Sequence, residues 1–139
     1  MIQEQLKKQL VANSPPCVKS LGGELTEIDC DQGSASMTFL IPLEFCHSGD
    51  IVQGGFVAAM LDATMYSAVV AKYIDVRAMP TLELKVSYLL PSKAGAFSVT
   101  ARVIKAGKST AFIEAHLFNA DGELTATGSS TARVFTAAA

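Results

Sequence analysis

One stretch of the chain constrains the fold more than any other: residues 49–73, with the sequence GDIVQGGFVAAMLDATMYSAVVAKY. Its helical part starts with Gly54 and Gly55 and continues as an almost uninterrupted apolar run that contains one carboxylate, Asp62. A helix that is apolar all round has to be enclosed, either by a protein core or by lipid. The run from Gly54 to Ala71 is shorter than the usual membrane span and has Asp62 near its centre. We therefore expect a buried helix and no membrane partner.

The composition is that of a globular protein. The chain has 139 residues, of which 50% are hydrophobic and 17% charged, enough for one domain with its own core. A formal net charge of −2 gives no general attraction to nucleic acid, so we expect no nucleic-acid partner. The three cysteines lack metal-ligand spacing and are typical of reduced thiols, which predicts a cytoplasmic protein without a metal site. The polar, amphipathic N-terminus predicts no secretory signal.

The segments around the apolar helix follow two different periodicities. Residues 2–11 predict a short helix that Pro15 and Pro16 would end, so that residues 1–16 lead into the main fold. From Leu21 onward the period is mostly two, which is typical of strands. The loop of residues 43–52 precedes the apolar helix, and residues 136–139 are expected to fray. About five strands are predicted, and the clearest of them cover residues 34–41, 81–90, 97–104, 109–118 and 123–135.

Tight turns connect the later strands. The segments PSKAG, KAGK and NADG are turn signals, and hairpin connections of this kind produce an antiparallel sheet. One face of such a sheet needs a cover, and the apolar helix is the only predicted element large enough to provide it. The sequence therefore predicts an α+β fold in which a curved antiparallel β-sheet wraps around a long central helix.

The start of the apolar helix has an unusual chemistry. No Ser, Thr, Asp or Asn stands there to cap it, so its first backbone N–H groups lack the usual side-chain acceptor. Bare N–H donors at the positive end of a helix dipole can stabilise an oxyanion, and glycine lets a ligand approach the backbone closely. The alternative for Gly54 and Gly55 is tight packing of the helix end against the sheet.

Asp62 is the second unusual feature. A buried carboxylate is costly unless it is paired or hydrogen-bonded, and such groups gather at functional sites. The alternatives are an Asp62 that faces solvent, or one that is bonded to Thr64 or to a strand residue. The narrow polar strip around Asp62 makes full exposure the weaker of these interpretations.

The spacing of Gly54 and Asp62 carries a structural consequence. Eight residues of helix separate them by about 12 Å. A reacting carbonyl has to lie within roughly 3 Å of both its oxyanion donor and its attacking group. One helix therefore cannot supply both groups to the same carbonyl. If both are catalytic, two antiparallel helices related by a two-fold axis must share the site, which predicts a homodimer.

Three segments of the chain resemble the hotdog-fold acyl-CoA thioesterases, and within them the branch of the phenylacetate-pathway and human thioesterase-superfamily-like proteins: HSGDIVQGGFVAAMLDATMYSA, PTLELKVSYLLPSKAG and DGELTATGSSTARVF. The similarity extends from about Gly22 to Val134. It implies a single hotdog domain, a homodimer that forms a dimer of dimers, and no cofactor.

The resemblance assigns roles to individual residues. Gly54 matches the oxyanion glycine, and Asp62 matches the nucleophile or general base. Thr81 matches a hydroxyl position that orients the water or the carboxylate. Two positions depart from the family pattern: Gln53 stands where His often precedes the glycines, and His47 stands where Asn is usual. Gln53 can still donate to a thioester carbonyl, whereas His47 would either hold water or substrate or only shape the loop.

Further residues are candidates for binding the substrate. The glycine at position 55 lies beside the oxyanion position, and apolar side chains of the helix would line an acyl pocket or serve as ordinary core: Phe56, Met65, Tyr66 and Val69. Turn lysines would bind the CoA phosphates or simply be solvated: Lys93, Lys105 and Lys108. A reactive pair of Cys46 and His47 is not expected, because sequence neighbours rarely face each other in reacting geometry. His116 lies outside every motif and is expected to be structural.

The sequence thus predicts a hydrolase that cleaves an acyl-CoA or aryl-CoA thioester. A G-x-S-x-G elbow, a Walker motif and HExxH are all absent, which argues against serine-hydrolase, P-loop and zinc-protease chemistry. The alternative is a non-catalytic hotdog protein that binds or senses acyl-CoA. Such a protein could dispense with a buried acid, so Asp62 favours the enzyme.

Overall fold

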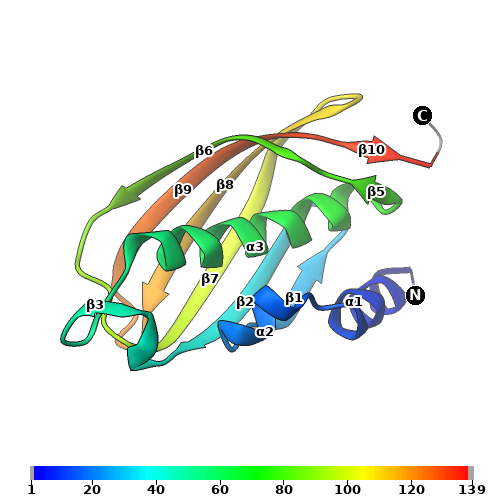
Figure 1. The fold of residues 1–139 in the computed structure, drawn as a ribbon. Helices are drawn as coiled ribbons and strands as arrows, with labels where there is room; N and C mark the ends of the chain where they lie inside the picture. The colour runs from blue at the N-terminus through cyan, green and yellow to red at the C-terminus, as the bar shows by residue number, and fades with distance from the viewer. Residues whose placement is uncertain (1, 138–139) are drawn as a thin grey trace.

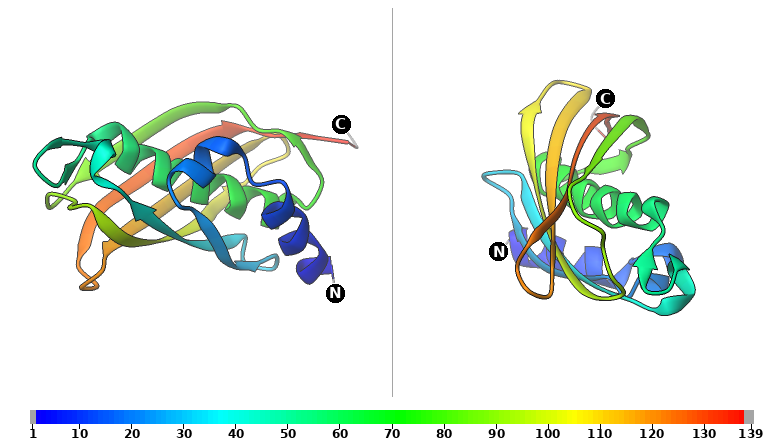
Figure 2. Two further views of the ribbon diagram at one scale, coloured as in Figure 1. Left: turned by 60° about the horizontal axis from the view of Figure 1, so that its bottom comes forward. Right: turned by 90° about the vertical axis from the view of Figure 1, so that its left-hand side faces the viewer.

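A helix of 20 residues, α3 (Gly54–Tyr73), lies against a six-stranded antiparallel sheet in the computed structural model, which describes residues 2–137 (Figure 1). The sheet curves so that its inner face wraps around the helix (Figure 2). The strand order is β1 (Glu24–Asp29), β2 (Ser34–Ile41), β7 (Gly95–Ala106), β8 (Thr110–Asn119), β9 (Leu124–Arg133) and β6 (Thr81–Tyr88). The α+β fold predicted from the sequence is confirmed.

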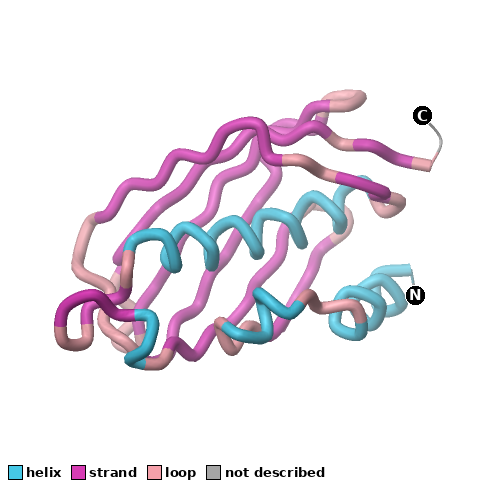
Figure 3. Tube along the Cα trace, in the orientation of Figure 1, coloured by secondary structure: helices cyan, strands magenta, loops and turns pink. Residues whose placement is uncertain are grey.

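Short elements complete the chain (Figure 3). Two helices precede the sheet, α1 (Ile2–Ala12) and α2 (Pro16–Ser20). The predicted loop before α3 contains the 3-10 turn η1 (Leu43–Phe45) and a small hairpin of β3 (Cys46–Ser48) and β4 (Ile51–Val52). A second two-stranded sheet pairs β5 (Val76–Ala78) with β10 (Phe135–Thr136).

Three expectations need correction. The main sheet has six strands rather than about five, because β1, which has no clear alternation of its own, pairs with β2. Pro16 does not only end the first helix; it occupies the first turn of α2, where its missing N–H costs nothing. Thr136 does not fray, because it pairs with Val76 in the small sheet. Of the rest of the predicted tail, residues 138–139 lie outside the described residues.

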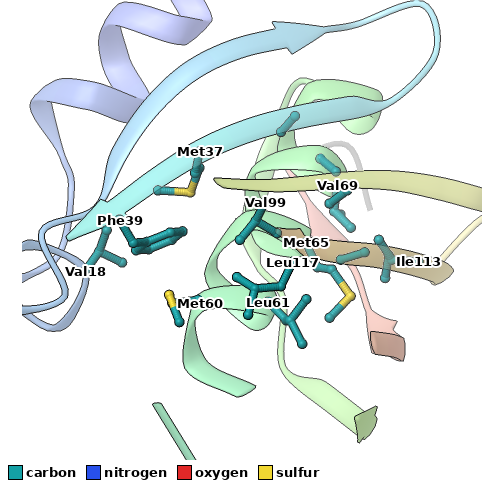
Figure 4. Close-up of a cluster of buried hydrophobic side chains, with 14 of the residues drawn as sticks. Val18, Met37, Phe39, Met60, Leu61, Met65, Val69, Val99, Ile113 and Leu117 are labelled. Carbon is teal, nitrogen blue, oxygen red and sulfur yellow. The ribbon is translucent and has the colours of Figure 1, made fainter. Parts of the chain in front are cut away.

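The core forms between α3 and the inner face of the sheet (Figure 4). Met60, Leu61 and Met65 on the helix are fully buried and pack with side chains of the sheet such as Val99 and Leu117. Burying a side chain of this size stabilises the fold by roughly 1.5–3 kcal/mol. By length and composition α3 could cross a membrane, yet ten of its residues are buried within the molecule. It is the core helix of this fold.

The C-terminal end of α3 has a strained backbone. Ile74 has a φ of 68° and a ψ of −46°, and the N–H of Asp75 donates to the carbonyl of Tyr73 at 2.7 Å. This is a γ-turn centred on a β-branched residue with a positive φ, which is unfavourable. The turn reverses the chain from the helix into β5.

Candidate active site

The lead-in to α3 positions the start of the helix. The N–H of Gln53 donates to the carbonyl of Phe45 at 2.9 Å, and the rings of Phe45 and Phe56 stack with centroids 4.5 Å apart. Gln53 occupies the N-cap position, and its side chain makes no capping hydrogen bond. Among residues 2–137, the amide N–H groups of Gly54 and Gly55 have no acceptor. The uncapped helix start expected from the sequence is thus present.

The two glycines have different surroundings. The hydroxyl of Tyr88 in β6 donates to the carbonyl of Gly54 at 2.7 Å. A Cβ atom on Gly54 would lie 3.1 Å from that hydroxyl oxygen, whereas a Cβ on Gly55 would meet nothing within 4 Å. Gly54 therefore packs against the sheet, while its own N–H has no acceptor among residues 2–137. The α-carbon of Gly55 faces open space.

Asp62 lies two turns further along α3 and is half-buried. The hydroxyl of Thr81, the first residue of β6, donates to Asp62 Oδ1 at 3.3 Å. Burial raises the pKa of the Asp62 carboxyl, and the hydrogen bond from Thr81 lowers it by a smaller amount, so the net shift is upward. Thr64 is not its partner, because the buried Thr64 hydroxyl donates to the carbonyl of Met60 at 2.9 Å.

The polar residues of the lead-in are exposed. The side chain of Gln53 is exposed at the start of α3. His47 is exposed in β3, and its Nδ1 lies 2.8 Å from the hydroxyl of Ser48. The thiol of Cys46 donates a weak hydrogen bond to the carbonyl of Pro42, 3.9 Å from the sulfur. No hydrogen bond joins Cys46 to His47.

The apolar candidates divide into two groups. Met65 and Val69 are fully buried, so within this chain they have the core role that the sequence left open for them. Tyr66 is 43% exposed and follows Asp62 by one helical turn. Phe56 is half-buried beside the glycines. Tyr66 and Phe56 are therefore the members of this set that a ligand at the surface of α3 can reach.

The three candidate lysines lie at opposite ends of the molecule. Lys93 forms a β-bridge with Ile51, next to the start of α3. Lys105 and Lys108 flank Gly107, whose carbonyl accepts a hydrogen bond of 2.6 Å from the hydroxyl of Tyr73 at the other end of the helix. A 20-residue helix is about 30 Å long, so the two groups are far apart within one chain.

His116 lies away from these residues. Two shallow hollows, of about 310 and 250 Å³, meet at Glu114 and His116 on the outer face of the sheet, opposite α3. Within residues 2–137 no cluster of three or more His, Cys, Asp or Glu side chains is arranged to hold a metal ion.

Tyr88 is the site residue that sequence reasoning missed. It belongs to the apolar alternation of β6, which marks it only as a residue of the inner face. Its contact with Gly54 spans 34 residues of sequence and depends on where β6 lies beside α3. No local signal in the sequence reveals it.

Comparison with known proteins decides the family. The family model described as the thioesterase superfamily matches residues 49–126, the segment that contains α3, Asp62 and Thr81. The chain belongs to the thioesterase superfamily. The hotdog fold and the resemblance identified in the sequence are thereby confirmed.

This thioesterase-superfamily protein is similar to several named proteins. It is 28% identical, over 92% of its own length and 93% of the other, to a protein of Sulfurisphaera tokodaii named "Putative esterase". The phenylacetic acid degradation-related protein of Ralstonia eutropha has a TM-score of 0.83 and 29% identity, covering 93% of this chain and 99% of that one. The PaaI protein of the E. coli phenylacetic acid degradation operon has a TM-score of 0.85 and 18% identity, covering 97% of this chain and 96% of that one, a likeness that concerns the fold alone.

A further structural neighbour contains a ligand. A hypothetical thioesterase of Streptococcus pneumoniae, solved with coenzyme A, has a TM-score of 0.76 and 15% identity, covering 86% of this chain and 91% of that one. At this level of identity the likeness concerns the fold alone.

Proposed function

We propose that this protein hydrolyses an acyl-CoA or aryl-CoA thioester to the free acid and CoA. The observation that carries the proposal is the half-buried carboxylate of Asp62, bonded to Thr81 and placed on the same helix as two uncapped N–H donors. Membership of the thioesterase superfamily supports thioester cleavage as the general reaction. The coenzyme A bound in a structural neighbour supports CoA as the thiol component.

Asp62 would act on the thioester carbonyl in one of two ways. As a general base it takes a proton from water while the water oxygen bonds to the carbonyl carbon. As a nucleophile it forms an acyl-enzyme anhydride that water then cleaves. In both routes the C–S bond breaks and CoA leaves as a thiolate, a good leaving group that reduces the need for a strong acid. Thr81 would orient the carboxylate, or the attacking water, toward the thioester carbonyl carbon.

The N–H of Gly54 would stabilise the oxyanion, helped by the positive end of the α3 dipole. Gln53 is exposed beside it and would donate from its side-chain amide to the same oxygen. His47 is exposed in β3, in the hairpin that precedes Gln53 and the start of α3. It would contact water or the substrate there.

The site would be shared between two copies of the chain. Gly54 and Asp62 lie about 12 Å apart along α3, which is too far for one carbonyl to reach both groups. Strand β6 is an edge strand of the six-stranded sheet, so among residues 2–137 one of its sides has no strand partner. Leu82 in this strand is 63% exposed. An exposed apolar edge strand favours pairing with another strand. Two β6 strands paired about a two-fold axis would set the α3 helices antiparallel, and two such dimers would form the tetramer.

The same arrangement would bring the lysines together. In antiparallel helices the end of one lies beside the start of the other, so Lys105 and Lys108 of one subunit would approach Lys93 of the second. These ammonium groups would bind the CoA phosphates. The acyl group would then lie along the exposed side of α3, over Gly55, Phe56 and Tyr66, with Met65 beneath them.

We also propose a cytoplasmic location, which the free thiols of Cys17, Cys30 and Cys46 favour.

Release of free thiol from a panel of acyl-CoA and aryl-CoA thioesters tests this function. We expect turnover of at least one member, and that Asp62→Asn abolishes most of it. Saturable binding of CoA thioesters without thiol release would instead identify a non-catalytic acyl-CoA-binding protein and overturn the proposal.

A further inference from the structure

We propose that Tyr88 is a positioning residue of this site, whose hydroxyl holds the Gly54–Gly55 peptide in the orientation that presents the free N–H of Gly55 beside the proposed oxyanion donor, the N–H of Gly54. The inference rests on the hydrolysis proposed above and adds a residue to it. Tyr88 acts through the backbone of Gly54 and is not itself placed on the substrate.

The Tyr88 contact lies at the first turn of α3, where no side chain caps the helix. The carbonyl of Gly54, which accepts the Tyr88 hydroxyl at 2.7 Å, belongs to the Gly54–Gly55 peptide. The N–H of that same peptide is the free donor of Gly55. A hydrogen bond to the carbonyl therefore restrains the plane of the peptide and so the direction of its N–H. The N-cap side chain supplies no such restraint, because Gln53 makes no capping hydrogen bond.

The backbone that carries Tyr88 is anchored independently. The N–H groups of Leu89 and Leu90 donate to the carbonyl of Thr125 at 2.9 and 3.2 Å. Thr125 is fully buried, and its hydroxyl accepts a hydrogen bond from Ser92 at 3.3 Å. The carbonyl of Ser92 accepts the N–H of Val52, two residues before Gly54, at 2.8 Å. The end of β6 and the start of α3 are thus tied to a common buried support, which gives the Tyr88 hydroxyl a defined place.

Steric contact makes the arrangement specific to glycine at position 54. A Cβ there would lie 3.1 Å from the Tyr88 hydroxyl oxygen and 3.3 Å from the ring carbon that bears it. An alanine at position 54 would therefore push the hydroxyl back by a few tenths of an ångström and weaken its hydrogen bond. Position 55 carries no such constraint, since its Cβ would meet nothing within 4 Å.

The hydrogen bond also acts electronically. A donor to a peptide carbonyl polarises the peptide and strengthens its N–H as a donor. Tyr88 is 54% exposed, so water replaces much of the bond in the unfolded chain and the net gain in stability is small. We therefore expect the loss of the hydroxyl to change the rate much more than the melting temperature.

Removing only the hydroxyl, with Tyr88→Phe, tests the role. We expect kcat and kcat/KM to fall together by roughly tenfold, less than the loss that follows removal of an oxyanion donor itself. Tyr73→Phe is the matched control, because it removes a hydroxyl-to-carbonyl bond of 2.6 Å at the opposite end of the same helix. That control should lower the melting temperature and leave kcat unchanged. An unchanged kcat in Tyr88→Phe, or a loss explained by unfolding, overturns the proposal.

A double-mutant cycle identifies the route through which Tyr88 acts. In Gly54→Ala the hydrogen bond is already weakened, so adding Tyr88→Phe should lower kcat by clearly less than it does in the wild-type protein. A second tenfold loss in the Gly54→Ala background would mean that Tyr88 acts on something other than the start of α3.

Amide spectra of protein labelled with ¹⁵N-glycine test the contact without any need for turnover. Tyr88→Phe should move the resonances of Gly54 and Gly55 and leave Gly128, which packs against Leu61, in place. If the wild-type protein cleaves no thioester, the proposed function fails, and these spectra still decide whether Tyr88 sets the helix start. Unmoved resonances of Gly54 and Gly55 would contradict the positioning role even in an active enzyme.

Discussion

The hydroxyl of Thr81 lies 3.3 Å from Asp62 Oδ1, so the first residue of the edge strand holds the single carboxylate of the central helix. This contact has two opposing effects on one group. Burial of Asp62 favours its neutral form, while the hydrogen bond from Thr81 favours its charged form. A carboxylate that is weakly solvated in its charged form is suited to attack or to accept a proton.

Asp62→Asn should lower kcat by about two orders of magnitude or more, because it removes the proposed base or nucleophile. The measurement is thiol release by folded protein. Asp121→Asn, in the turn between β8 and β9, is the control and should retain full activity. Near-normal turnover in a well-folded Asp62→Asn protein would remove Asp62 from the mechanism.

The same variant should not lose stability at neutral pH. Because the pKa of Asp62 is raised in the folded state, its contribution to stability is present below the unfolded pKa and is lost as pH rises through the folded pKa. Above the folded-state pKa the charged form of Asp62 therefore costs the fold stability, and Asn removes that cost. Thermal unfolding at pH 7 should show an equal or higher melting temperature for Asp62→Asn, and a clearly lower one would contradict the burial argument.

Thr81 should set the acid limb of the pH profile. The proposed mechanism requires the base form of Asp62, so kcat/KM should fall as pH decreases through a pKa above the ordinary value of 3.8. Thr81→Ala removes the hydrogen bond that lowers this pKa, so the acid limb should move to higher pH. Thr81→Ser keeps the hydroxyl and should leave the limb in place. Thr81→Ala and Gln53→Ala should each lose less activity than Asp62→Asn loses. If unfolding of these variants fully explains their lost activity, Thr81 and Gln53 have a structural role only.

Gly55→Ala should separate stability from activity. The added methyl group meets open space, and alanine is favoured over glycine in a helix by about 0.5–1 kcal/mol. We expect a higher melting temperature together with a raised KM, because the methyl group occupies the surface where the substrate would lie. A stabilised variant with unchanged kinetics would show that substrate does not approach Gly55.

A mixed dimer tests whether the site is shared. Asp62→Asn and Gly54→Val should each be inactive as homodimers, but one site of a mixed dimer would contain neither substitution. Co-refolding at equal amounts should restore up to about a quarter of wild-type activity if pairing is random. Light scattering and circular dichroism check that Gly54→Val folds. Verified mixed dimers without activity would mean that both groups act within one chain, or that Gly54 is not the oxyanion donor.

Ile74→Gly should stabilise the protein. The positive φ of 68° is unfavourable for a β-branched residue, and glycine removes this backbone strain. The Ile74 side chain is 47% exposed, so its removal costs little packing energy. We expect a net gain in the free energy of unfolding of about 1 kcal/mol. Urea unfolding should show a higher midpoint with an unchanged slope. Ile104→Gly, in strand β7, should destabilise the protein. A lower midpoint for Ile74→Gly would show that packing of Ile74 outweighs its backbone strain.

The local pattern of the sequence determined the elements of this fold. The apolar run of α3, its uncapped start and the isolation of Asp62 are properties of neighbouring residues, as is the alternation along β2 and β6. Elements with weak patterns of their own were missed. Strands β1, β5 and β10 exist because a partner strand supplies their hydrogen bonds, and α2 is only five residues long.

Only the tertiary structure decided how the site is put together. Thr81 reaches Asp62 across 19 residues and Tyr88 reaches Gly54 across 34, and both contacts depend on the register of β6 beside α3. The same packing placed Met65 in the core and left Tyr66 exposed, although the two residues are adjacent in an equally apolar run. A sequence pattern specifies which face of an element is apolar. The path of the whole chain specifies which residue of another element meets that face, because such contacts arise from packing between distant segments.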